Sequence, residues 1–236
     1  MIRRVVRLGA QGLMIAMMFM AVKTGLSQGS AQVVPLDKLA NARLQHVKAE
    51  LETYKGRRSL RVTDDAKQTA GDVERLLILP ETDFQDGIIE LEVTGDVLPA
   101  AIEQARGFVG LAFRVAPEAT KYECFYVRPT NGRADDQVRR NHSTQYVSHP
   151  EFPWYRLRKE FPEKYESYVD LVPGEWTKIK IEVRGRNAKL YVHGSTQPVL
   201  LVNDLKLGEA KGAIALWIGT GTVAHFAKLR VTHWKN

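Results

Sequence analysis

The stretch GEWTKIKIEVRGRNAKLYVHG, residues 174–194, decides the fold class. Apolar and polar side chains alternate along 175–184 and again along 187–193, and a period of two residues is that of a β-strand. The residues between the two segments, Gly185 and Arg186, mark a tight turn. The outward positions of the first segment are all charged, which is typical of a sheet face in water: Lys178, Lys180, Glu182 and Arg184. We therefore predict two consecutive strands, the first with one buried and one solvated face.

The same period recurs along most of the chain. Further strands are predicted at 43–54, 58–63, 73–79, 87–94, 107–115, 120–128, 198–202, 212–219 and 222–233. One short helix is predicted over 153–160, with Pro153 in its first turn. This pattern predicts an all-β fold, a two-sheet antiparallel jelly-roll sandwich that occupies residues 32–236 as a single domain.

Composition excludes several classes of protein. Of the 236 residues, 44% are hydrophobic and 26% charged, which indicates a globular domain with a core. The single cysteine, Cys124, excludes an intrachain disulfide and a cysteine-based zinc site. No pair of histidines has a metal-ligand spacing, so neither a metal nor a cofactor is predicted.

The first residues, 1–31, are predicted to be a signal peptide. Met1–Arg7 is basic, Leu13–Val22 is apolar, and the small residues 29–31 suit a cleavage site. The alternative is a permanent anchor helix, but a run of this length is shorter than the roughly 20 residues needed to span a bilayer. We therefore expect a periplasmic or secreted protein with no stable membrane anchor after cleavage.

Removal of this segment also changes the charge balance. It takes away four of the 34 basic residues and none of the 27 acidic ones, so the formal net charge falls from +7 to +3. A surplus of this size does not indicate a nucleic-acid partner.

The alternation also predicts which side chains share the outer face of a sheet. Arg114, Tyr126 and Trp217 fall at outward positions of three strands, beside the small residues Gly110 and Ala112. Small residues beside large aromatic and charged ones leave room for a sugar ring. We therefore predict a groove that binds a carbohydrate.

The insertion over 129–170 is too long for a hairpin connection, and loops of this length usually have a function or are disordered. Its many aromatic residues argue against disorder. Two interpretations stay open: the insertion only covers a sheet, or it adds polar and aromatic groups to the groove. The binding candidates around it are Arg128, Asn131, Arg133, His142 and Trp154.

A catalytic role is the alternative to binding. Glu90 and Glu92 share one strand face with carboxyl groups about 6–7 Å apart, which falls between the separations used for retention and inversion of a glycosidic bond. His142 or Asp136 would be the partner. Exposed glutamates on a strand are otherwise ordinary solvated residues.

Four segments carry a resemblance to a known family: FQDGIIELEV at 84–93, GFVGLAFRV at 107–115, the stretch at 174–194, and GAIALWIGTGTVAHFAKLRV at 212–231. Together they resemble concanavalin A-like lectin/glucanase domains, most closely the laminin G-like and keto-disaccharide hydrolase branch of exported bacterial proteins. The Glu-x-Asp-x-x-Glu strand motif of the glucanases is missing here, because Glu90-Leu91-Glu92 lacks the aspartate and the third acid.

The resemblance implies the fold and leaves three functions open. The first is an exported domain that binds a carbohydrate or glycoconjugate in the groove. The second is a glycan-acting hydrolase of the keto-disaccharide hydrolase type. The third is a protein-interaction module that uses the aromatic insertion. The sequence does not indicate an oligomeric state.

Overall fold

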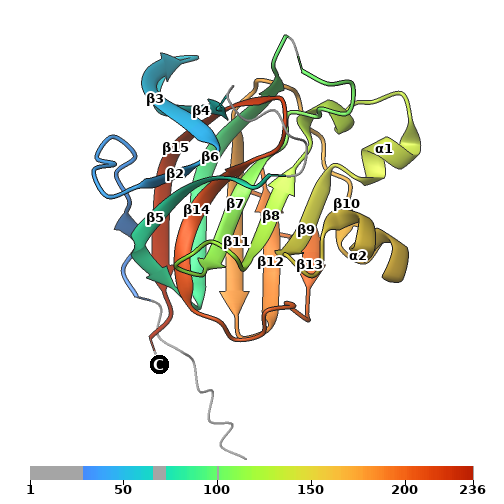
Figure 1. Ribbon diagram of the computed structural model, residues 1–236. Helices are drawn as coiled ribbons and strands as arrows, with labels where there is room; N and C mark the ends of the chain where they lie inside the picture. The colour runs from blue at the N-terminus through green and yellow to red at the C-terminus, as the bar shows by residue number, and fades with distance from the viewer. Residues whose placement is uncertain (1–28, 66–72, 100, 236) are drawn as a thin grey trace, which may run out of the picture.

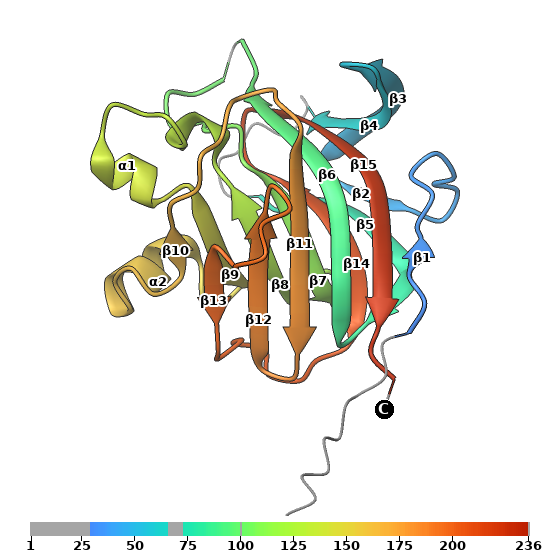
Figure 2. The same ribbon diagram turned by 180° about the vertical axis from the view of Figure 1, so that it is seen from behind.

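The computed structural model describes residues 29–65, 73–99 and 101–235, and it confirms the all-β class: two antiparallel sheets pack face to face (Figure 1). Sheet 1 contains, in spatial order, β13 (Leu200–Val202), β12 (Asn187–Val192), β11 (Thr177–Arg184), β6 (Gly87–Val97), β15 (Thr222–His233), β4 (Arg57–Asp64) and β3 (Val47–Tyr54), with β1 (Gln32–Val33) also paired to β15. Figure 2 shows this sheet from its outer side.

Sheet 2 contains, in spatial order, β10 (Glu166–Ser167), β9 (Thr144–His149), β8 (Tyr122–Val127), β7 (Val109–Val115), β14 (Gly212–Ile218), β5 (Arg75–Phe84) and β2 (Arg43–Gln45). Three short helices follow β8 and β9: η1 (Pro129–Asn131), α1 (Gln137–Asn141) and α2 (Trp154–Glu160). No helix among the described residues is long and apolar enough to cross a membrane. The predicted signal peptide falls almost entirely on residues 1–28, outside the described residues.

The predicted strands are present, with one difference at the N-terminal end. The segment predicted as one strand over 43–54 is divided at His46, whose φ of 53° lies in the left-handed region. The chain turns at this residue and passes from sheet 2 to sheet 1. An alternating pattern that continues through the break does not reveal a change of sheet.

The prediction of one long loop over 129–170 is wrong. Within it, β9 pairs with β8 and β10 pairs with β9, so the segment extends sheet 2. The helix predicted over 153–160 is confirmed as α2, which buries Leu157 completely. The five-residue helix α1 was not predicted because it has no buried residue and therefore no apolar period. Both α-helices lie at the β9–β10 edge of the sheet (Figure 1).

The core lies between the two sheets, as the alternation requires. From β6, Ile89, Leu91 and Val93 point inward and are buried, and from β14 the inward residues are Leu216 and Ile218. The opposite positions of these strands point away from the core, toward one of the two outer faces.

The β3–β4 hairpin continues sheet 1 beyond β15, and its side chains Glu52 and Tyr54 contact His225 on the outer face of that sheet. The Nδ1 atom of His225 is 2.8 Å from Oγ1 of Thr94, and its Nε2 is 2.6 Å from Oε1 of Glu52. The ring stacks on Tyr54 at a centroid distance of 3.8 Å. Burial lowers the pKa of His225 below its ordinary value of 6.5, against the opposing effect of Glu52.

This pKa shift predicts a loss of stability in mild acid. Below pH 6.5 the unfolded chain takes up a proton on His225 more readily than the folded chain does. The unfolded state therefore binds more protons, and the free energy of unfolding decreases as the pH is lowered. We expect the decrease between pH 7.5 and pH 5.5, measured by urea denaturation, to be smaller in His225→Gln than in the wild type. An identical decrease in both proteins would contradict this assignment.

Candidate functional site

A cleft of about 690 Å³ lies on the outer face of sheet 2. Its floor comes from strands β5, β14, β8 and β9 and from Phe108, directly before β7. Its walls come from the loop 102–106 and from the segment 149–158 that contains the start of α2. Figure 1 shows sheet 2 from this side. The cleft therefore uses the outward positions that the alternation assigned to the strands of this sheet.

Trp217 and Tyr126 form an aromatic platform on the floor. In the strand register Trp217 lies beside Gly110, and Gly110 beside Tyr126, so the two aromatic residues flank a glycine on one face. The rings lean over the glycine and stack with a centroid distance of 4.6 Å. A Cβ atom on Gly110 would lie 2.2 Å from the carbonyl oxygen of Phe125, so this closely packed position requires glycine.

The two rings of the platform differ in accessibility. Tyr126 is only 3% exposed, whereas Trp217 is half-buried. A ligand in the cleft therefore meets Trp217, and Tyr126 supports that ring from beneath. Burial raises the pKa of Tyr126 to about 12, so its hydroxyl keeps its proton and remains a donor and acceptor.

Glu74 holds the edge of the platform in place. Its carboxylate accepts hydrogen bonds from Nε1 of Trp217 at 3.3 Å and from the hydroxyl of Tyr122. Nδ1 of His149 lies 3.4 Å from the same carboxylate, and the His149 ring stacks on Tyr122. Glu74 is not among the predicted site residues. It precedes Leu76, the cross-strand neighbour of Trp217, by two residues, which puts it on the cleft side of the sheet.

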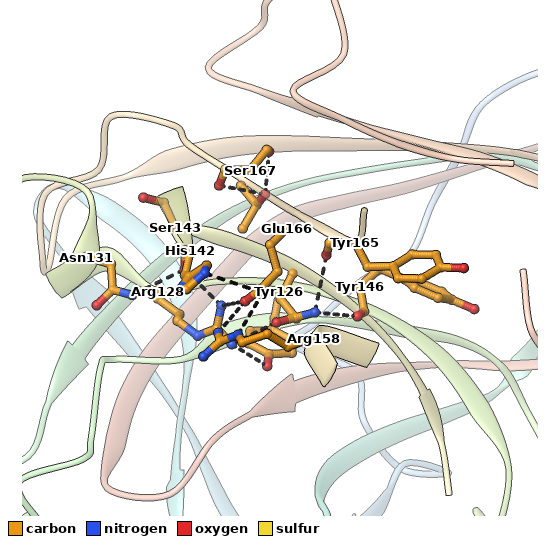
Figure 3. A network of polar contacts seen from close by, with 12 residues as sticks. Tyr126, Arg128, Asn131, His142, Ser143, Tyr146, Arg158, Tyr165, Glu166 and Ser167 are labelled. Atoms are coloured by element: carbon orange, nitrogen blue, oxygen red, sulfur yellow. Dashed lines mark hydrogen bonds and ion pairs between the residues drawn. The ribbon is translucent and has the colours of Figure 1, made fainter. Parts of the chain in front are cut away.

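Arg128 lies beside Tyr126 and is buried. Figure 3 shows its network of polar contacts. Its Nη1 donates to the carbonyl oxygen of His142 at 2.8 Å and to Oε1 of Glu166 at 3.3 Å. Its Nη2 donates to the Tyr126 hydroxyl and to Oε1 of Gln145, both at 3.0 Å. The prediction gave Arg128 a direct contact with the ligand, but these partners make it a positioning residue that ties β8 to β9 and β10.

Glu166 is the buried acid of this network. Arg158 of α2 donates to both of its oxygens, at 2.5 and 2.9 Å, in addition to the bond from Arg128. Nε2 of His142 is 3.7 Å away. Burial lowers the pKa of His142, with Arg158 and Arg128 acting in the same direction and Glu166 against it. A neutral His142 at pH 7 offers the cleft a polar edge.

The buried position of Arg128 leads to a stability prediction. Arg128→Ala leaves the Tyr126 hydroxyl and Gln145 without their donor, and we expect the free energy of unfolding to fall by about 2–4 kcal/mol. The exposed Arg133, which pairs with Asp170, is the matched control, and Arg133→Ala should leave the free energy of unfolding nearly unchanged. Urea denaturation measures both, and equal values for the two variants would contradict the role of Arg128.

The cleft walls contain two further predicted residues. Trp154, at the start of α2, is 45% exposed, and the Arg158 guanidinium lies 4.9 Å from its ring centroid. Asn131 of η1 also lines the cleft and donates its side-chain amide to the carbonyl oxygen of His142 at 3.2 Å. The structure thus brings together Trp217, Tyr126, Arg128, Asn131, His142 and Trp154.

Glu90 and Glu92, the predicted catalytic candidates, do not lie in this cleft. Their strand, β6, belongs to sheet 1, and both residues face the far side of the sandwich beside a separate hollow of about 370 Å³. Glu92 is buried between Arg57 at 2.5 Å and Lys228 at 3.2 Å. The alternation gave the correct side of the strand, but it carries no information about which sheet contains the strand.

Arg114 is also misplaced by the sequence pattern. A β-bulge between β7 and β14 adds a residue at this point, and Arg114 takes a φ of 54°. Its buried side chain donates to the carbonyl oxygens of Gln85 at 3.0 Å, Gly185 at 2.7 Å and Gly208, and it pairs with Asp86 at 2.9 Å. The residue therefore clamps three connections between strands and does not line the cleft.

Arg133 and Asp136 lie outside the cleft as well. Arg133 forms a bidentate pair with Asp170, both bonds 2.8 Å long. Asp136 is the N-cap of α1 and accepts a hydrogen bond from the backbone of Arg139 at 2.7 Å. Each side chain is occupied by a local structural contact, so neither supports the predicted role.

Comparison with known proteins yields similarity at the level of structure. No family model matches the chain, and no curated protein sequence matches it. A Bacillus subtilis protein of unknown function with a galectin-like fold has a TM-score of 0.57 at 12% identity, covering 90% of this chain and 100% of that one. A carbohydrate-binding module from the same organism, CBM66, has a TM-score of 0.50 at 12% identity, covering 79% and 94%.

A sialidase gives a third similar structure, with a TM-score of 0.52 at 10% identity; the match covers 84% of this chain and 17% of the sialidase. At these identities the similarity is one of fold. These neighbours share the two-sheet antiparallel sandwich of this chain, which is the fold that the resemblance of its strand motifs to concanavalin A-like domains implied.

Proposed function

We propose that the protein binds a glycan in the cleft on the outer face of sheet 2, with one sugar ring stacked on Trp217. The observation that carries this proposal is the platform itself: a half-buried tryptophan whose orientation is fixed by Tyr126 and Glu74. The apolar face of a pyranose ring packs on an aromatic ring, while its hydroxyl groups need polar neighbours. His142 and His149 supply such groups at the two ends of the platform.

The similar structures add support by analogy of fold. One of them is a carbohydrate-binding module, and another has a galectin-like fold. One fold carries many functions, so this analogy only makes glycan binding a reasonable function to test first. The support for the proposal comes from the residues of the cleft.

Glycan hydrolysis is the second candidate, and Glu74 is the residue that favours it. Its side chain is 28% exposed in the cleft and lies beside His149, so it has access to a ligand. Glycoside hydrolysis normally uses a second carboxyl group. Glu166 is poorly suited to this role because Arg158 and Arg128 occupy its oxygens. Binding without cleavage is therefore the function that the geometry supports best.

A glycan array probed with the purified protein tests the proposal. We expect retention on a defined subset of oligosaccharides, with no release of reducing sugar from the retained ones. Release that Glu74→Gln abolishes would favour the hydrolase instead. Retention on no glycan, together with capture of a protein partner through the exposed aromatic residues of α2, would favour the interaction module.

Export belongs to the same proposal. A cleaved signal peptide over residues 1–31 would place the glycan-binding domain in a periplasm or outside the cell, where polysaccharides are accessible. Mass spectrometry of the protein recovered from that compartment tests this part, because cleavage removes the N-terminal segment.

A further inference from the structure

The cleft carries an excess of positive charge. Five arginines line it: Arg75, Arg106, Arg128, Arg139 and Arg158. Three of them have carboxylate partners in the fold. Arg75 pairs with Asp64 at 2.8 Å, and both Arg128 and Arg158 pair with Glu166.

Arg106 and Arg139 remain after these pairs are formed. Within the described part of the chain, neither guanidinium has a carboxylate within 4.0 Å. Arg106 lies in the wall loop 102–106, and its Nη1 donates to the carbonyl oxygens of Glu103 and Ala105. Arg139 of α1 is exposed and lines the same cleft.

The two side chains act on the same region of the cleft. Burial lowers the pKa of Arg106, and the positive charges of Arg139 and Arg128 lower it further, against the opposing effect of the Glu103 carboxylate. The loop of Arg106 is also joined to η1, because the backbone N–H of Thr130 donates to the Arg106 carbonyl oxygen at 3.4 Å. Positive groups that repel one another in a cleft are stabilised when an anion lies between them.

We infer that the ligand is an acidic glycan whose anionic group, a carboxylate or a sulfate ester, lies between Arg106 and Arg139. This inference rests on the proposed function, because a sugar ring on Trp217 brings a substituent to this end of the cleft. A guanidinium donates to such oxygens through two parallel hydrogen bonds, which favours an anionic substituent over a hydroxyl. Glu74 lies at the other end of the platform, beside His149, so the anionic group of the glycan would lie away from the Glu74 carboxylate.

The test compares matched ligands on one array. Oligomers of glucuronic, galacturonic and mannuronic acid are spotted next to the same oligomers with their carboxyl groups reduced to alcohols, and sulfated galactan oligomers are spotted next to desulfated ones. We expect at least one acidic oligomer to bind about tenfold or more tightly than its neutral counterpart. The pair that shows the preference distinguishes carboxylate from sulfate. Equal binding of acidic and neutral members in every pair would overturn the inference.

Two variants locate the effect. Arg139→Gln and Arg106→Gln should each weaken binding of the acidic oligomer about tenfold and leave binding of its neutral counterpart unchanged. Arg133→Gln, outside the cleft, is the matched control, and thermal melting verifies that each variant is folded. Arg139 is exposed, so its variant tests the inference even if Arg106→Gln is unstable. Wild-type affinity of both folded variants for the acidic oligomer would overturn the proposal.

The inference and the proposed function fail in different ways. Neutral glycans that bind without an acidic preference, and lose binding in Trp217→Ala, would overturn the acidic site and leave glycan binding in the cleft intact. If Trp217→Ala and Arg139→Gln each bind acidic glycans as tightly as the wild type does, both the acidic site and glycan binding in the cleft would be overturned.

Discussion

Replacing Trp217 with alanine should weaken glycan binding by about 30-fold or more, the size of effect expected when a central aromatic residue is truncated. The reason is that Trp217 supplies the accessible ring of the platform, whereas its neighbour Tyr126 is almost completely buried. Without the indole, a sugar ring would face Gly110 and the edge of Tyr126. Isothermal titration calorimetry with the best ligand from the array measures the change.

Two further variants make this result specific. Trp217→Phe keeps an aromatic face and loses the bond to Glu74, so it should retain part of the affinity. Trp234→Ala is the matched control, because Trp234 lies outside the cleft, donates to the carbonyl oxygen of Val183 at 2.9 Å and packs against Arg184. Unchanged affinity in Trp217→Ala, or an equal loss in Trp234→Ala, would contradict the assigned position of the sugar.

Replacing Arg114 with alanine should destabilise the protein by about 3–5 kcal/mol, a large share of the stability of an ordinary domain. The Arg114 side chain is fully buried, and its donors satisfy three backbone carbonyl oxygens as well as Asp86. Alanine leaves those carbonyl groups without a donor and leaves a cavity in place of the guanidinium. The backbone strain at a φ of 54° is similar for arginine and alanine, so the difference in the free energy of unfolding between wild type and variant comes from the loss of the side chain.

Urea denaturation of three variants tests the clamp. Arg114→Lys keeps the charge but cannot reach all four acceptors, so we expect a loss of stability close to that of Arg114→Ala. Arg58→Ala, at an exposed position of β4, should change the free energy of unfolding by less than about 0.5 kcal/mol. A loss below 1 kcal/mol in Arg114→Ala would show that the clamp has no structural role.

The strands and the aromatic platform could be predicted from the sequence because both depend on a local period. Side chains two residues apart in a strand share a face, so Tyr126 and Trp217 were correctly assigned to outward positions without knowledge of the sheets. The helix α2 was predictable for a similar reason, since Pro153 and Pro162 bound a short segment that buries Leu157.

The errors arise where tertiary structure overrides that period. Glu90 and Trp217 both point outward, but β6 and β14 lie in opposite sheets, and only long-range pairing decides this. At Arg114 a single bulge residue rotates the side chain away from the cleft face. Glu166 could not be identified either, because β10 has two residues and its pairing with β9 leaves no pattern in the sequence.

A crystal structure of the protein soaked with the tightest-binding oligosaccharide tests the central claim most directly. We predict a sugar ring in van der Waals contact with the exposed face of Trp217. Electron density for the glycan on the outer face of sheet 1, in the hollow beside Glu90 and Tyr191, would contradict the account.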